Sequence, residues 1–368
     1  VVGTIVLAIL VTLGAQAAPK SLDDLMQDLR GGDDAARSLA RQFIPRHGID
    51  PIPTLIPLIF EADSSVAWAA DKIIRDICND VSVPGREADR VVVAHALLNA
   101  LAATDVPEQQ FTVLRILPIV VPEEVDLAAV ETLLYNDATK ERARRALQEI
   151  NTAAARMALR TALPKADPDF ACALMDALDK TGDNKAASLL ADKLEVGTPA
   201  EQAAAARALA RTGDHTLVAP FAELARTIDI NHRFAAEDAA LRLAATLATQ
   251  GGTWEAGMDL YRTMLAQSEN PVIQGGALAG LGRFGDDSAL ETIMAAWASD
   301  ESGLLEGPAM AAIDFLQDPA VPGLLMTAYA DQPVRIQERL LGIMGRTQDP
   351  RYLPLFETAD NVDPAIRI

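Results

Sequence analysis

The residues that could do chemistry are few and widely spaced in this sequence. The four histidines stand in no H-E-x-x-H motif and beside no cysteine cluster; they are His47, His95, His215 and His232. The chain also lacks a C-x-x-C-H haem-attachment motif, a Walker loop and a G-x-S-x-G nucleophile motif. We therefore predict a protein that is not an enzyme, with no catalytic residue, no cofactor and no metal site.

A second group of polar residues is regularly spaced. An aspartate follows each of five expected helix ends; these are Asp183, Asp214, Asp286, Asp318 and Asp349. A carboxylate at such a position can accept hydrogen bonds from the free N–H groups that open the next helix. Calcium binding is the alternative, but the sequence has no D-x-[DN]-x-[DN]-G loop. Helix capping is the predicted role. Leu324 and Leu325, six and seven residues after Asp318, are expected to pack against the neighbouring helices.

One basic stretch stands out from the acidic background. Residues 140–165 contain only two acidic residues, Glu141 and Glu149, against seven basic ones: Lys140, Arg142, Arg144, Arg145, Arg156, Arg160 and Lys165. On a helix pair they could form a patch that docks an acidic partner or the acidic face of a second copy. The candidate partner-binding residues are Arg142, Arg144, Arg145, Arg156 and Arg160. The alternative is a solvated face with internal salt bridges.

Two aromatic residues occupy equivalent positions in successive repeats. Trp297 and Tyr329 each lie 11 residues after a capping aspartate. They are candidate partner-binding residues, because an aromatic pair one repeat apart could line a binding groove. Each also lies four residues after an expected core position, Ile293 or Leu325, which favours packing inside the protein instead.

The bulk composition limits the class of partner. The chain has 368 residues, of which 50% are hydrophobic, and its net charge is −20. An acidic surface repels phosphate backbones, so we expect no nucleic-acid partner. Cys78 and Cys172 lie about three repeats apart, which is too far for a disulfide.

The elements that must position these residues recur along the chain. Proline and glycine stand 14 residues apart in three pairs, Pro168/Gly182, Pro199/Gly213 and Pro271/Gly285, and the prolines continue at Pro333 and Pro364. Proline suits the first turn of a helix, and glycine suits a left-handed cap at its end. A period of about 31 residues indicates stacked two-helix repeats. The sequence therefore predicts an all-α solenoid.

The first half of the chain is less regular. Residues 64–104 form a longer unit with a loop near Pro84, and segments 105–136 and 137–167 can each hold a helix pair. Residues 230–269 form a second long unit, with its turn at Gly251-Gly252. We therefore divide the chain into a signal peptide, divergent repeats and regular repeats at 1–17, 18–167 and 168–368, and expect the repeats to continue beyond Ile368.

The repeat resembles HEAT repeats, in particular the short bacterial HEAT-like repeats related to those of phycobilisome lyases. The matching residues are Pro364-Ala365-Ile366-Arg367 and Leu281-Gly282-Arg283-Phe284-Gly285-Asp286. The likeness is specific over 168–368 and weaker over 33–167. It implies a right-handed α-α superhelix of the HEAT or armadillo type, with a protein-binding concave face built from the second helices.

The N-terminal residues indicate export. Residues 1–13 are largely apolar and lead to Ala15-Gln16-Ala17, the pattern of a secretory signal peptide that here lacks its start. An uncleaved anchor or a buried helix is the alternative. We expect a periplasmic or extracellular protein with no membrane span after cleavage.

Together these features predict an exported, non-catalytic scaffold that binds a protein or peptide. Two alternatives remain open at this point. One is chaperone-like or lyase-like handling of a cofactor, and the other is a structural array within a longer envelope protein.

Overall fold

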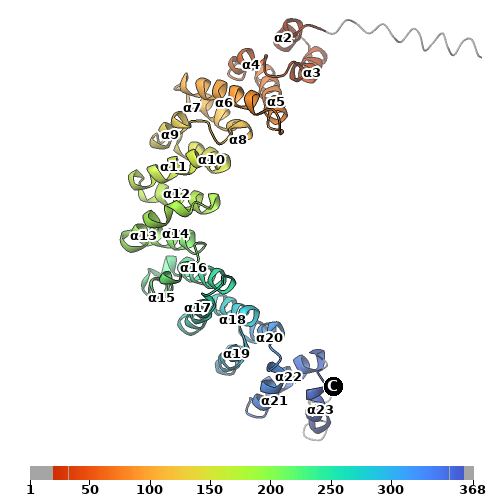
Figure 1. The fold of residues 1–368 in the computed structure, drawn as a ribbon, viewed down its shortest axis with the longest axis vertical. Helices are drawn as coiled ribbons and strands as arrows, with labels where there is room; N and C mark the ends of the chain where they lie inside the picture. Colours follow the sequence, from red (N-terminus) through yellow and green to blue (C-terminus); the bar gives the residue numbers. More distant parts are fainter. Residues whose placement is uncertain (1–19, 32, 348, 360–368) are drawn as a thin grey trace, which may run out of the picture. The chain divides into compact units, whose positions relative to one another are not determined.

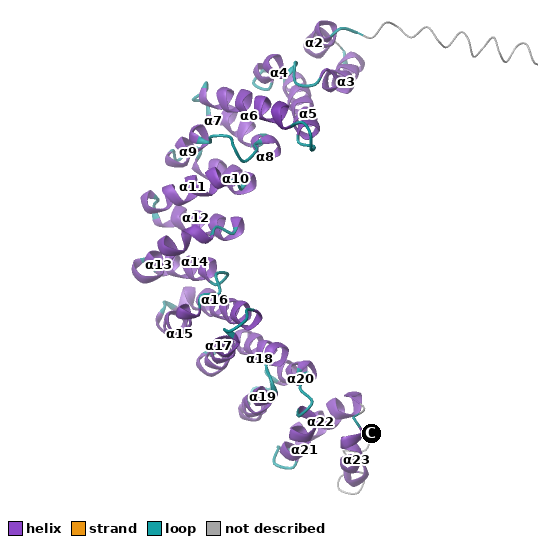
Figure 2. Ribbon diagram, viewed as in Figure 1, coloured by secondary structure: helices purple, strands orange, loops and turns teal. Residues whose placement is uncertain are grey.

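The computed structural model describes residues 20–31, 33–347 and 349–359. Within these ranges every regular element is a helix and none is a strand (Figure 1, Figure 2). The predicted all-α class is confirmed. The chain divides into two compact units, Val1–Lys165 and Ala166–Ile368. The expected signal peptide and the expected repeat opening at Pro364 lie outside the described residues.

Unit 1 begins with short helices and then contains its longest pair, α5 and α6, on either side of a turn at Gly85. Asp63 caps α5 by accepting a hydrogen bond from the Ser65 N–H at 2.8 Å. This pair is the long unit expected over 64–104. The helices are α2 (Leu22–Gly31), α3 (Asp34–Phe43), α4 (Ile52–Leu58), α5 (Ser64–Val81), α6 (Glu87–Ala102), α7 (Pro107–Leu114), α8 (Leu117–Val120), α9 (Ala128–Thr132), α10 (Lys140–Ile150) and α11 (Ala153–Ala162), with 3₁₀ turns at Ile44–His47, Leu133–Tyr135 and Leu163–Lys165.

The helix pair expected over 105–136 was wrong in detail. This segment instead holds three short helices, α7 to α9, and a 3₁₀ turn. Pro118 opens α8 and Pro122 follows its end, because proline cannot donate a helical hydrogen bond and restricts the residue before it. The next segment, 137–167, does form the expected pair, α10 and α11.

Unit 2 is a two-layer stack of helix pairs (Figure 1). Each first helix packs on the next first helix, and second helices pack beside them. The first helices are α12 (Pro168–Thr181), α14 (Pro199–Leu209), α16 (Ile230–Thr249), α18 (Pro271–Phe284), α20 (Glu306–Phe315) and α22 (Val334–Thr347). The second helices are α13 (Ala187–Val196), α15 (Val218–Thr227), α17 (Trp254–Gln267), α19 (Asp287–Ser299), α21 (Val321–Tyr329) and α23 (Leu353–Ala359), and 3₁₀ turns at Asn184–Ala186, His215–Leu217 and Pro350–Tyr352 precede α13, α15 and α23.

The predicted capping role is confirmed for four of the five aspartates, Asp183, Asp214, Asp286 and Asp349. Each of the five carboxylates accepts a hydrogen bond from the backbone N–H two residues later, at 2.8 to 3.3 Å. For these four aspartates the bond opens either a second helix or the 3₁₀ turn that leads into it. Asp318 instead bonds within the turn before α21, whose N-cap residue, Ala320, makes no side-chain capping bond. No group of three or more His, Cys, Asp or Glu side chains in the described part of the chain could hold a metal ion.

The predicted left-handed glycine cap holds at Gly182, where φ is 68°, but not at Gly285, where φ is −78°. A Cβ built on Gly285 would lie 2.3 Å from the Leu281 carbonyl oxygen and 2.6 Å from the Ala289 Cβ. Glycine is required there by close packing at the start of α19, and not by a left-handed backbone.

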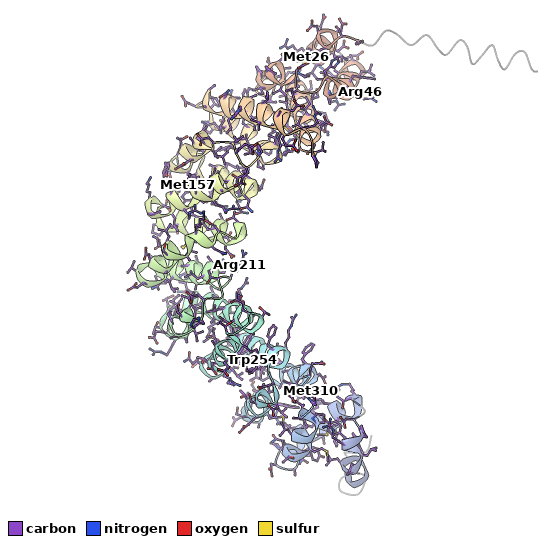
Figure 3. The ribbon with its side chains drawn as sticks, in the orientation of Figure 1. Met26, Arg46, Met157, Arg211, Trp254 and Met310 are labelled. Atoms are coloured by element: carbon purple, nitrogen blue, oxygen red, sulfur yellow. The ribbon has the colours of Figure 1, made fainter. Side chains whose placement is uncertain are left out.

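Hydrogen bonds from long side chains join successive repeats of unit 2. Figure 3 labels two of the donors, Arg211 and Trp254. Arg211 donates to the Asp179 carbonyl oxygen and carboxylate one repeat earlier, and Arg346 donates to Asp314 at 2.7 Å. The Trp254 indole N–H donates to the Phe284 carbonyl oxygen at 2.6 Å. In each case the acceptor is a carbonyl or carboxylate oxygen near the C-terminal end of a first helix. These bonds therefore fix the position of one repeat against the next.

Candidate functional site

A groove runs between the neighbouring second helices α19 and α21 in unit 2. Its volume is about 580 Å³. Six apolar side chains line it, and the rest of its lining is polar or acidic. The apolar residues are Leu290, Met294, Ala295, Ala298, Leu324 and Ala328, and the others are Asp287, Ser288, Glu291, Thr327, Asp331 and Gln332.

Helical spacing places these residues on the groove side of each helix. Leu290 and Met294 are four residues apart on α19, and Leu324 and Ala328 are four residues apart on α21. Residues at this spacing share one face of a helix. The neighbour Leu325 is buried, whereas Leu324 is 40% exposed, so α21 packs with one leucine and presents the other to the groove.

The outer helix α21 has an unusual composition for its position. Val321–Tyr329 contains no charged residue, although the helix lies in the second-helix layer and exposes Leu324. Surface helices generally carry charged residues on the face away from the core, and a helix that is apolar all round is usually covered. This composition marks the groove wall as a surface suited to contact with another molecule.

The charged side chains that line the groove are all acidic among the described residues. Asp287 and Glu291 lie one helical turn apart on α19, and Asp331 follows the end of α21. None of the described side chains that line the groove is Lys, Arg or His. A nearby cation, Arg262, donates to the Ser288 hydroxyl at 3.1 Å and forms an ion pair with Asp259 at 3.1 Å. The groove therefore combines an apolar floor with an acidic rim.

Trp297 does not lie on a binding surface, so its assignment as a partner-binding residue was wrong. Its side chain is 0% exposed, and its indole N–H is buried without a hydrogen-bond partner among the described residues. The four-residue spacing from buried Ile293 puts it on the core face of α19. Tyr329 is half-buried, and burial raises its pKa, but it is not among the residues that line the groove.

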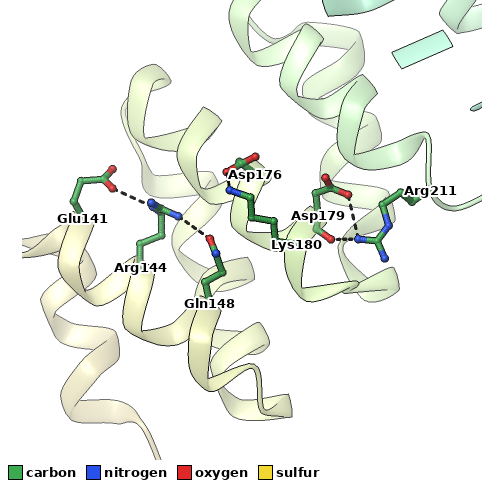
Figure 4. A network of polar contacts seen from close by, with 7 residues as sticks. All are labelled: Glu141, Arg144, Gln148, Asp176, Asp179, Lys180 and Arg211. Carbon is green, nitrogen blue, oxygen red and sulfur yellow. Dashed lines mark hydrogen bonds and ion pairs between the residues drawn. The ribbon is translucent and has the colours of Figure 1, made fainter. Parts of the chain in front are cut away.

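The basic residues of α10 and α11 do not make one continuous patch. Arg144 is only 8% exposed and donates to Glu141 and Gln148, both at 3.1 Å (Figure 4). Burial removes Arg144 from the candidate partner-binding residues. Arg145, by contrast, is exposed.

The other arginines of this set also contact their surroundings within unit 1. The Arg142 guanidinium lies over the Phe111 ring, 5.4 Å from its centre, and Arg156 donates to the Asn151 carbonyl oxygen at 2.8 Å. Arg160 is half-buried on α11. Internal contacts, which were the alternative interpretation, account for much of this basic stretch.

The remaining chemically capable groups occupy structural positions. Burial raises the pKa of the Cys78 thiol to about 12 and also raises the pKa of Cys172; both cysteines are free, as expected. A reactive thiol needs a lowered pKa, so neither has the environment of a nucleophile. The run Gly280–Gly285 has the spacing G-x-G-x-x-G, but it lies at the C-terminal end of α18 and not between a strand and a helix.

The groove residues were not identified from the sequence. The repeat pattern places Leu324 beside Leu325 among the expected packing residues, and the acidic residues of α19 do not stand out in a chain rich in Asp and Glu. The clue in the sequence was the uncharged run Val321–Tyr329 on an expected second helix.

In the described part of the chain, no helix is both long and apolar enough to cross a membrane.

No protein family model and no curated protein matches the chain. Among solved structures, an engineered protein is similar at 18% identity and a TM-score of 0.38, over 90% of this chain and 100% of its own. The karyopherin Kap121p bound to the SUMO protease Ulp1p is similar at 12% identity and a TM-score of 0.49, over 93% of this chain. A Kap121p mutant is similar at 13% identity and a TM-score of 0.45. This chain spans 47% of each of these two karyopherin chains.

Proposed function

We propose that this protein is a non-catalytic helical-repeat scaffold that binds a protein or peptide partner in the groove between α19 and α21. The observation that carries the proposal is a groove of about 580 Å³ with an apolar floor in the second-helix layer. Binding sites are typically concave and largely apolar, with a few polar groups that orient the ligand. Covering the groove would remove Leu324 and its neighbours from water, which favours association.

The groove lies in the layer of second helices, which the resemblance to HEAT repeats implies as the binding face. Both walls are second helices, α19 and α21, and first helices pack behind them. A stack of packed helix pairs holds the walls in place before a partner arrives, so little ordering entropy is lost on binding.

The proposal is tested by photo-crosslinking in cells that naturally produce the protein. A photoreactive amino acid replaces Leu324 in one strain and Val272, an exposed residue of α18, in a control strain. We expect a discrete adduct from position 324 that is absent from position 272. It should disappear when Ala295→Tyr fills the groove.

Equal adducts from both positions, or an adduct that survives Ala295→Tyr, would exclude the groove as the docking place. No adduct from position 324 would overturn the proposal and favour a structural array instead.

We also propose that the scaffold works outside the cytoplasm. The support is the apolar run that ends at Ala15-Gln16-Ala17. N-terminal sequencing of the mature protein should begin at Ala18, and fractionation should recover it with exported proteins. A mature chain that retains residues 1–17 and remains in the cytoplasm would refute export without affecting the groove.

A further inference from the structure

We propose that the occupant of the α19–α21 groove is a basic amphipathic helix of a partner protein. This inference rests on the proposed function and names the class of partner. Three features of the groove support it: the nature of its walls, the spacing of its apolar side chains and the sign of its charge.

The walls favour a helix over an extended peptide. An extended peptide gains much of its affinity by adding a strand to a sheet edge. Both walls here are α-helices, whose backbone N–H and C=O groups are bonded within each helix. A peptide in this groove would therefore bind mainly through side-chain contacts and would form few main-chain hydrogen bonds with the walls.

The apolar floor matches the apolar stripe of a helix. On α19, the buried Leu290 and Met294 form the bottom of the groove, and Ala295 and Ala298 are exposed beside them. On α21, Leu324 is exposed and Ala328 lies one helical turn further along. A helix that packs its ridges into such a groove presents apolar residues at i, i+3, i+4 and i+7. The 13 residues of α19 span about 20 Å, so about three to four turns of a partner helix can lie along this wall.

The rim selects the charge of the partner. Asp287 and Glu291 lie on the α19 wall, and Asp331 lies at the end of the α21 wall. Lys or Arg residues beside the apolar stripe of the partner would meet these carboxylates. Like charges that face each other across an interface are unfavourable, so an acidic helix is rejected.

The test uses two synthetic 16-residue helical peptides with the same leucine stripe. One carries Lys and the other Glu at the flanking positions, and each has a fluorophore. Anisotropy titrations with the purified full chain should show that the Lys peptide binds at least about tenfold more tightly than the Glu peptide, and more weakly as salt is added.

Two charge-reversal variants locate the binding site. The double variant Asp287→Lys/Glu291→Lys should weaken binding of the Lys peptide by about tenfold. The matched control Asp192→Lys/Glu195→Lys makes the same change in net charge at exposed positions of α13, in the same layer, and should leave binding within about twofold. Circular dichroism melts establish that both variants fold.

The outcomes separate this inference from the proposed function. Groove-dependent binding of the Glu peptide, or equal losses in the two double variants, would overturn the basic-helix proposal while an adduct from position 324 still supported a scaffold. Sedimentation of the protein alone should show no self-association that depends on the groove. Self-association abolished by Asp287→Lys/Glu291→Lys would replace the separate partner with a second copy of this chain.

Discussion

At the scale of single residues, Trp297 contributes to stability and not to recognition. Because it is fully buried, Trp297→Ala should lower the free energy of unfolding by about 3–5 kcal/mol. Trp297→Phe should cost less, since it keeps an aromatic ring and removes an indole N–H that finds no acceptor among the described residues. Urea denaturation followed by circular dichroism measures both changes, and equal losses would contradict this account.

The capping role of Asp214 predicts a pH dependence. Hydrogen bonds from the Thr216 hydroxyl and N–H lower the pKa of its carboxyl below 3.8. A lowered pKa in the folded state gives stability that is present above the ordinary pKa and lost as the pH falls through the folded value. Asp214→Ala should therefore cost about 1 kcal/mol at pH 7, with the difference from the wild type shrinking below pH 3.8. Asp214→Asn keeps an oxygen acceptor, so its cost in free energy of unfolding should vary much less with pH. Urea titrations of the wild type and both variants at several pH values measure this.

Arg144 and its neighbour Arg145 should behave differently when each is changed alone. Arg144→Ala removes the partner of Glu141 and Gln148 from a buried position and should cost about 1–3 kcal/mol. Arg145 is exposed, so Arg145→Ala should change the free energy of unfolding by less than about 0.5 kcal/mol. Equal effects in urea denaturation would show that Arg144 is not buried in solution. Any binding study of this basic stretch should therefore change the exposed Arg142 and Arg145 and leave Arg144 in place.

At the scale of elements, close approach of α18 and α20 depends on Gly282. A Cβ at this position would lie 2.3 Å from the Ala312 carbonyl oxygen, so one helix must shift. Gly282→Ala should cost about 1–3 kcal/mol, as overpacking does elsewhere. The control Gly342→Ala, at an exposed position inside α22, meets only the Arg346 guanidinium at 3.9 Å and should stabilise by up to about 1 kcal/mol, because alanine favours helix interiors. Thermal melts of the two variants should move in opposite directions.

At the scale of the whole molecule, each helix packs on near neighbours in the sequence. In such arrays stability is shared between adjacent repeats and is not spread over one common core. Gly282→Ala should therefore speed hydrogen exchange in the helices beside α18, which are α16, α17, α19 and α20, and leave α5 and α6 of unit 1 unchanged. Exchange measured by mass spectrometry should show this restriction. A uniform increase across the chain would indicate one cooperative unit.

The sequence by itself determined the repeat, its helix pairs and their caps. Pro168 opens α12, Gly182 ends it, and Asp183 caps the turn that follows. These features could be predicted because they depend on interactions within a few residues along the chain. Gly285 does not have the expected left-handed φ; it must be glycine because a Cβ would meet the Leu281 carbonyl oxygen and the Ala289 side chain, which helical spacing alone did not predict.

Only the tertiary structure decided which side chains face a neighbour and which face solvent. Trp297 and Arg144 were candidates for recognition and are buried, whereas Leu324 was expected in the core and lies at the groove. Helical spacing predicts which residues share a face of a helix. It does not predict how much of that face a neighbouring helix covers, and so which of its side chains remain exposed. The groove lies where α19 and α21 pack beside each other, and its shape depends on contacts between adjacent repeats, which the spacing within one helix does not describe.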